Sequence, residues 1–133
     1  MMPRIFALKT VAENRGSLTV IERGVPFPIR RVFYTHHVPV GTVRGKHAHK
    51  RSRIALVVVA GACEVSGYTS DGESWFFRLA DPTTGLLLDP GDWHQMKFIE
   101  DGTVLLCLSS EDYDSQDYIH EPPKTSAEDK VTS

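Results

Sequence analysis

Val43-Arg44-Gly45-Lys46-His47-Ala48-His49-Lys50 places two histidines one residue apart, just ahead of the apolar run Ile54–Ala60. If this stretch is a β-strand, residues i and i+2 point to the same face of a sheet, so His47 and His49 share one face. Imidazole titrates near neutral pH and is also the commonest metal ligand in proteins. The pair therefore indicates acid–base machinery, half of a metal site, or two ordinary histidines on a surface strand.

The chain on both sides of this stretch consists of short apolar or alternating runs separated by turn formers such as Asn14-Arg15-Gly16 and Ser70-Asp71-Gly72. Sustained helical periodicity is absent before residue 110. This spacing predicts an all-β protein, a small jelly-roll or cupin-type β-barrel. The run Ile54–Ala60 is apolar on both faces, so we expect it at the centre of a sheet or against another subunit. The predicted strands are residues 5–10, 18–22, 31–35, 43–50, 54–60, 63–68, 74–79, 85–88, 94–98 and 103–108.

A chain of 133 residues is long enough to bury a core as one domain. We expect that domain to span residues 1–120, followed by a mobile tail from 121 to 133 that has little apolar surface to bury. The sequence contains no apolar run typical of a signal peptide or a membrane span, which predicts a cytoplasmic protein. Cys63 and Cys107 lie in apolar surroundings and are expected to be buried thiols.

The charges are unevenly distributed, although the formal net charge is only −2. Asp and Glu are absent between Arg23 and Cys63, a stretch rich in arginine and lysine. This predicts a positively charged region and an anionic ligand. Nucleic acid is not expected, because aromatic residues do not alternate with the cations as in single-strand platforms. A small phosphorylated ligand fits better.

Two segments resemble the conserved motifs of the cupin superfamily. One is Gly41 followed by His47-Ala48-His49 and Gly61, and the other is Gly91-Asp92-Trp93-His94. The resemblance implies a jelly-roll in which His47, His49 and His94 converge. Metal-binding cupins carry a glutamate four or five residues after the second histidine, where this chain has Arg53 and Ile54. We therefore expect no metal and no other cofactor, although three histidines alone can hold Zn²⁺.

A closer resemblance covers most of the chain. Arg44-Gly45-Lys46-His47-Ala48-His49-Lys50 and the string Glu111-Asp112-Tyr113-Asp114-Ser115-Gln116-Asp117-Tyr118-Ile119 are similar to the sugar 3,4-ketoisomerase family of metal-free cupins, related to the C-terminal domain of WxcM-like proteins. The resemblance implies an isomerase that acts on dTDP-4-keto-6-deoxy-glucose in the biosynthesis of 3-amino deoxysugars. It also implies a homodimer with exchanged N-terminal strands.

Moving a ketone from C4 to C3 requires a base and an acid close to two neighbouring carbons. The resemblance and the shared strand face point to His49 as proton carrier and His47 beside it. Tyr34 is a candidate donor to the developing enolate oxygen. Arginine suits bidentate contacts with phosphate. The residues expected to bind the dTDP-sugar are Arg30, Arg31, Arg44, Lys46, Trp93 and His94.

Other functions remain open at this stage. A metal-dependent cupin, such as a dioxygenase, or a nucleotide-sugar epimerase could use the same fold. A non-catalytic sugar-binding cupin would keep the arginines but would not need two histidines on one face. The C4 configuration of the product depends on the side from which the proton returns, and the sequence leaves it undecided.

Overall fold

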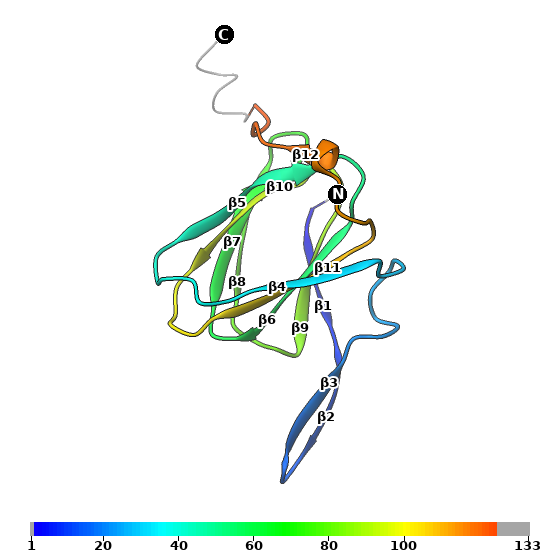
Figure 1. The fold of residues 1–133 in the computed structure, drawn as a ribbon, viewed down its shortest axis with the longest axis vertical. Coiled ribbons are helices and arrows are strands. Elements are labelled where there is room, and N and C mark those ends of the chain that lie inside the picture. Colours follow the sequence, from blue (N-terminus) through cyan, green and yellow to red (C-terminus); the bar gives the residue numbers. More distant parts are fainter. Residues whose placement is uncertain (1, 125–133) are drawn as a thin grey trace.

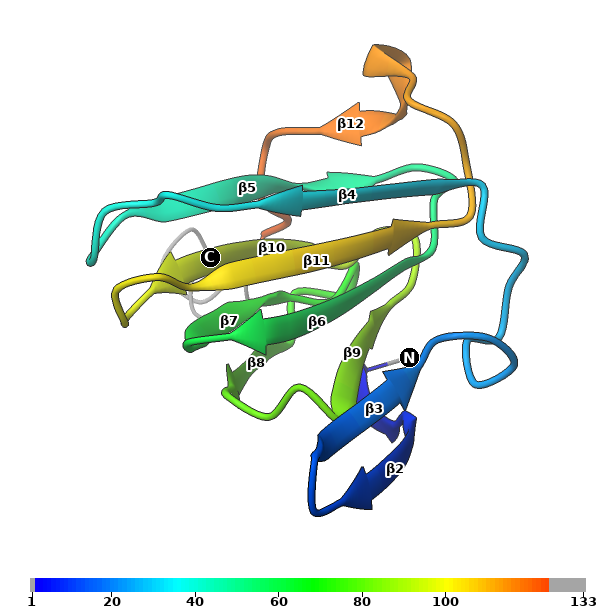
Figure 2. The ribbon, with the colours of Figure 1, turned by 60° about the horizontal axis from the view of Figure 1, so that its bottom comes forward.

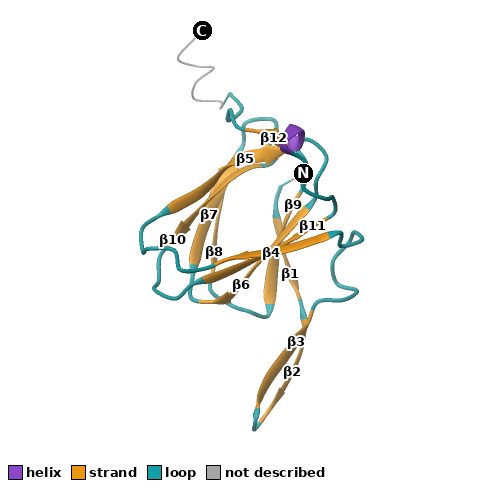
Figure 3. Cartoon of the chain, in the orientation of Figure 1, coloured by secondary structure: helices purple, strands orange, loops and turns teal. Residues whose placement is uncertain are grey.

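The computed structural model describes residues 2–124, which form an almost purely β-structured protein with one short 3₁₀ turn, η1 (Ser115–Asp117) (Figure 3). The strands are β1 (Arg4–Ala7), β2 (Lys9–Glu13), β3 (Gly16–Val20), β4 (Arg31–Thr35), β5 (Val43–His49), β6 (Ile54–Ala60), β7 (Cys63–Tyr68), β8 (Ser74–Leu79), β9 (Thr84–Leu88), β10 (Trp93–Phe98), β11 (Val104–Ser109) and β12 (Tyr118–Ile119). The all-β prediction is confirmed.

Two five-stranded antiparallel sheets face each other (Figures 1 and 2). One has the order β1-β9-β6-β11-β4, and the other has the order β12-β5-β10-β7-β8. This is a jelly-roll arrangement, as predicted, but the hydrogen-bonded sheets over residues 2–124 stay separate and do not close into a barrel.

The apolar core fills the space between the two sheets. Leu56 and Val58 of β6 pack toward Val65 of β7, Leu86 of β9 and Phe98 of β10, and each of these side chains is at most 1% exposed. Complete burial of such a side chain contributes roughly 1.5–3 kcal/mol relative to leaving it in water. The alternation of β7, in which every second residue is buried, follows from the period of two along a strand.

Strand β6 is buried on both faces, as its sequence predicts. It occupies the middle of the first sheet, between β9 and β11. Its outward-facing Ala55 is covered by Val25 and Phe27 from the segment that leads into β4, and Leu87 and Leu108 complete this second cluster. The covering segment accounts for the burial of Ala55, whereas Val59 near the end of the strand is 43% exposed.

The N-terminal region differs from the prediction of one strand over residues 5–10. The chain turns at Leu8, which is buried and whose amide donates to the carbonyl of Thr83 at 2.8 Å. β1 then pairs with β9, whereas β2 pairs with β3 in a separate hairpin that projects from the body (Figure 1). Strand β12, which pairs with β5, was not expected from the sequence either.

Within residues 2–124, helical structure is too short to span a membrane. Of the tail expected to be mobile, residues 125–133 lie outside the described residues.

Candidate functional site

A cavity of about 200 Å³ opens between the two sheets. Its walls come from β4, β5, β6, β10 and β11, together with β12, so sequence-distant segments meet there. The cavity is lined by Phe33, Thr35, Arg44, Gly45, His47, His49, Ile54, Leu56, His94, Met96, Leu105, Cys107 and Tyr118. A mostly apolar wall with a few convergent polar groups is typical of a small-molecule site.

Three histidines converge in this cavity, as the sequence predicts. His47 and His49 share one face of β5, and His47 pairs across the sheet with His94 of β10. The ring centroids of His47 lie 5.0 Å from His49 and 4.9 Å from His94. A register shift occurs in β10 after His94, opposite Gly45 and Lys46, both of which have a positive φ. Because glycine adopts this conformation without strain, Gly45 suits the irregular step that precedes the histidine pair.

Burial keeps these histidines neutral near pH 7. Loss of water, reinforced by the neighbouring histidines, lowers the pKa of His47 to about 4 and that of His94 to about 3. Burial also lowers the pKa of His49, although Asp117 opposes this effect. The Nδ1 of His94 lies 2.9 Å from the carbonyl oxygen of Asp92, which can only accept a hydrogen bond. The remaining nitrogen of His94 is then an acceptor.

Asp117, at the end of η1, lies behind His49. Its carboxylate is 3.2 Å from His49 Nδ1 and also accepts hydrogen bonds from Ser52 Oγ at 2.5 Å and from the Arg51 amide at 2.7 Å. Burial alone would raise the pKa of Asp117, but these bonds outweigh it and the pKa falls below its ordinary value. Asp117 is therefore an ionised carboxylate in a buried position.

Tyr118 covers the two strand histidines. Its ring centroid lies 4.8 Å from that of His47 and 4.8 Å from that of His49, and it lines the cavity. Sequence reasoning assigned no role to Asp117 or Tyr118. Asp117 lies in η1 and Tyr118 begins a strand of two residues, so no strand periodicity marks either of them.

Of the predicted cationic residues, only Arg44 lines the cavity. Within residues 2–124 no acidic side chain forms an ion pair with it. Arg31 stacks on Phe33 and Tyr113, with its guanidinium carbon 4.3 and 5.0 Å from the ring centroids. Arg30 is exposed and pairs with Asp112 at 3.3 Å. Lys46 is exposed on β5 and does not line the cavity. Acidic residues thus offset part of the predicted positive region.

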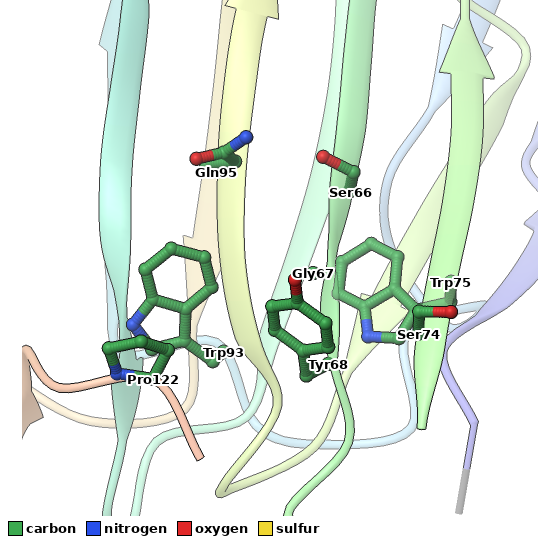
Figure 4. Close-up of a pocket in the computed structure, with 8 residues that line it drawn as sticks. All are labelled: Ser66, Gly67, Tyr68, Ser74, Trp75, Trp93, Gln95 and Pro122. Atoms are coloured by element: carbon green, nitrogen blue, oxygen red, sulfur yellow. The ribbon is translucent and has the colours of Figure 1, made fainter. Parts of the chain in front are cut away.

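Two predicted site residues lie elsewhere. Tyr34 is 62% exposed and points away from the cavity that its neighbours Phe33 and Thr35 line, with its ring 5.5 Å from that of His36. Trp93 lines a different hollow, on the other face of β10, beside Tyr68 and Pro122 (Figure 4). Its Nε1 donates to the carbonyl of His120 at 3.0 Å. This hydrogen bond anchors the segment that follows β12. The sheet separates Trp93 from the three histidines.

The histidine cluster also has the composition of a metal site. One ligand nitrogen from each of His47, His49 and His94 lies within 4.8 Å of the others, which would allow a divalent cation to bind after small movements. The position of the usual cupin glutamate is occupied by Ile54, whose side chain lines the cavity and supplies no donor. Cys107 also lines the cavity, but burial raises the pKa of its thiol to about 12, so it remains protonated.

A jelly-roll whose cavity holds three strand-borne histidines defines a cupin-type protein. Comparison with known families is more specific: a model described as FdtA, WxcM-like, C-terminal, matches residues 1–128. The chain belongs to this family, which agrees with the resemblance seen in the sequence.

Individual relatives are similar over nearly the whole chain. The TDP-4-oxo-6-deoxy-alpha-D-glucose-3,4-oxoisomerase of Aneurinibacillus thermoaerophilus is 35% identical, with 91% of this chain and 88% of that protein covered. A mutant of the 3,4-ketoisomerase QdtA from Thermoanaerobacterium thermosaccharolyticum, solved with TDP-4-keto-6-deoxyglucose, is 35% identical with a TM-score of 0.85, covering 90% and 87% of the two chains. A 3,4-ketoisomerase from Helicobacter canadensis is 30% identical with a TM-score of 0.85, covering 91% and 92%.

Proposed function

We propose that this protein is a dTDP-4-keto-6-deoxyhexose 3,4-ketoisomerase that serves the biosynthesis of 3-amino deoxysugars. The family and the relatives support the activity. The observation in the structure that carries the proposal is the pair His47 and His49, two neutral histidines on one strand face within a cavity. Such a pair can accept and return a proton at adjacent carbons of one sugar ring.

The reaction needs no oxidant or cofactor. A base removes the proton from C3, and the electrons of the C–H bond form the C3–C4 double bond of an enediolate. A proton then returns to C4, the proton of the C3 hydroxyl moves to the C4 oxygen, and the electrons of the C3–C4 double bond form the new C4–H bond, which leaves the ketone at C3. Since burial lowers the pKa of both His47 and His49, the empty site starts with bases rather than with a protonated acid. His49 is the proposed base, and the protonated His49 then becomes the source of the C4 proton, with His47 orienting the sugar or stabilising the enediolate.

The size of the cavity indicates which part of the substrate it can hold. About 200 Å³ is small beside the ~300–1,000 Å³ of pockets that hold whole drug-sized ligands. The sugar ring would therefore enter the cavity, and the pyrophosphate would remain at its mouth beside Arg44. Arg31, fixed over Phe33, is the second candidate contact. Arg30 and Lys46 are more exposed and would contribute mainly to the attraction of the anion.

We further propose that the protein works in the cytoplasm as a homodimer with exchanged N-terminal strands. The hairpin of β2 and β3 projects from the body, and Val11 and Leu18 on it are 51% and 61% exposed. Strand β4 ends its sheet and presents Val32 and Tyr34, also more than half exposed. Exposed apolar pairs of this kind favour burial against a second copy. Tyr34 would then face the partner subunit.

The proposal is tested by incubating the purified protein with dTDP-4-keto-6-deoxyglucose in D₂O and following the reaction by NMR. The expected product is the 3-keto sugar, with deuterium at C3 of returned substrate or at C4 of product, and its C4 configuration is read in the same spectrum. Deuterium at C5 with the ketone still at C4 would identify an epimerase instead. Unchanged substrate would contradict both activities.

A metal-dependent reaction is the second candidate, because the three histidine nitrogens lie close enough to share an ion. The same time course is repeated after dialysis against a chelator. We expect an unchanged rate, since Ile54 stands where the fourth ligand of metal cupins would be. Activity that disappears with the chelator and returns with one added divalent ion would establish the metal-dependent alternative.

A further inference from the structure

We propose that Asp117 is a positioning residue of this site, which holds His49 with its proton on Nδ1 and its lone pair on Nε2, directed at the sugar. The inference deepens the proposed isomerase function and rests on it for the role of His49 as base. It concerns a residue that does not touch the cavity wall and acts through its neighbour.

The hydrogen bonds of Asp117 fix the direction of its contact with His49. The side chain is 3% exposed, and its carboxylate accepts from Ser52 Oγ and from the amide of Arg51. An ionised carboxylate has only acceptors, so the 3.2 Å contact requires His49 Nδ1 to be the donor. A neutral imidazole with its proton on Nδ1 has its lone pair on Nε2, on the opposite side of the ring. That side belongs to the cavity, where His47 and His94 lie.

The main chain around Asp117 makes this arrangement rigid. The Lys50 amide donates to the Asp117 carbonyl at 2.7 Å, directly after His49 in sequence. On the other side, the Asp117 amide donates to the Asp114 carbonyl at 3.0 Å, and the Asp114 side chain caps η1. The next residue, Tyr118, pairs with His49 across β5 and β12. Main-chain hydrogen bonds of β5, η1 and β12 therefore fix the positions of both the carboxylate and the imidazole.

This contact would matter most during the reaction. When Nε2 takes the C3 proton, His49 becomes a cation in a buried place, and the negative charge 3.2 Å away offsets its loss of water. An asparagine at position 117 could keep its oxygen for the Arg51 amide, and its NH₂ group would then replace Oδ2, the oxygen that His49 and Ser52 share. Its amide could instead donate to Nδ1, which would move the ring proton to Nε2 and leave no base facing the sugar.

The first test needs no substrate, and it uses a variant only to assign one signal. Long-range ¹H–¹⁵N NMR of the ring nitrogens in the unaltered protein at neutral pH reports which nitrogen of His49 carries the proton, with assignment by a His49→Asn spectrum. The expected result is the Nδ1–H form. The Nε2–H form would overturn the proposal even if the enzyme proves to be a ketoisomerase. Because activity is not measured, failure of the proposed reaction would leave this result interpretable.

The second test compares Asp117→Asn with two controls that keep the carboxylate of Asp117. Ser52→Ala removes one of its donors, and Asp114→Asn weakens the cap of the same turn. We expect Asp117→Asn to lose ~10²–10⁴-fold in kcat, with KM within about threefold, and to show the Nε2–H form of His49. The two control variants should lose less than about fivefold in kcat, and His49 should keep its proton on Nδ1 in both. Equal losses in all three variants, with the tautomer unchanged, would reduce Asp117 to an anchor of the loop.

Discussion

At the scale of single residues, His47 and His49 differ in their surroundings although they share a strand face. Within residues 2–124, only His49 of this pair contacts a carboxylate, and burial lowers the pKa of His47 to about 4. We expect His49→Asn to lose ~10²–10⁴-fold in turnover and to stop exchanging the C3 proton with D₂O, while nucleotide binding measured by calorimetry is unchanged. His47→Asn should lose less and should still exchange that proton. A His49→Asn variant that exchanges at the wild-type rate would transfer the role of base to Tyr118 or His94.

His94 also makes stability depend on pH. Its folded-state pKa of about 3 lies below the ordinary value of 6.5 because the ring is buried. Between pH 6.5 and 3 the unfolded chain binds a proton that the folded chain does not, so this group removes stability as pH falls. From pH 7 to pH 5 the loss should be about 2 kcal/mol. Urea unfolding at both pH values checks this, with His94→Gln expected to lose about 2 kcal/mol less than the wild type.

Comparing the wild type with His94→Gln also controls for the titration of Asp92. Asp92, beside His94, has a pKa raised to about 6 by burial, and a raised carboxyl pKa adds stability as pH falls below 6. This opposing effect is present in both proteins and cancels in the difference between them. Identical pH dependences for wild type and His94→Gln would mean that His94 takes up a proton in the folded state.

At the scale of elements, the contact between β7 and β10 depends on the absence of a side chain at Gly67, which pairs with His94. A Cβ added there would collide with the Trp93 carbonyl oxygen and lie 2.9 Å from Trp75 Cζ2. We expect Gly67→Ala to lower the free energy of unfolding by ~2–3 kcal/mol and to reduce activity by displacing β10. Denaturant unfolding measures the first effect. Gly24→Ala, whose Cβ would meet its nearest atom at 3.7 Å, should change stability by less than about 1 kcal/mol.

The strands that the sequence predicts best are those with a strong local pattern. Residues 31–35, 54–60, 63–68 and 74–79 match β4, β6, β7 and β8. The break at Leu8 could not be predicted, because Leu8 continues the apolar pattern of β1 and only the distant carbonyl of Thr83 draws its amide out of the strand. β12 is two residues long and exists only as a partner of β5, so it leaves no periodic signal.

In the candidate site too, residues placed by a local sequence pattern could be predicted, and residues placed by contacts distant in sequence could not. The H-x-H spacing places His47 and His49 on one face, and the motif resemblance brings His94 to them. The partner of His49 could not be predicted, since Asp117 is 68 residues away and its carboxylate looks like one of several in an acidic stretch. Trp93 and His94 are neighbours in a strand and so face opposite ways, which explains why only one of them reaches the histidine cavity.

At the scale of the whole molecule, the core and the histidine cavity lie between the two sheets, while the hairpin of β2 and β3 projects from this body (Figures 1 and 2). Val11 and Leu18 face each other across this hairpin as a cross-strand pair. Paired strands with an exposed apolar face need a further surface to be stable. A second copy of the chain that covers the hairpin would therefore best explain why its apolar side chains are exposed in a single copy.

The proposed homodimer gives the last prediction. Light scattering after gel filtration should find twice the chain mass of 14.9 kDa for the wild type. Leu18→Glu places a charge in the apolar pair and should shift the protein toward monomer at micromolar concentration, because an unpaired carboxylate is costly to bury. Ser17→Glu adds the same charge on the opposite face of the hairpin, where Ser17 is exposed and pairs with Ala12, and should remain dimeric. A monomeric wild type, or a Leu18→Glu variant as dimeric as the Ser17→Glu control, would remove the hairpin from the subunit contact.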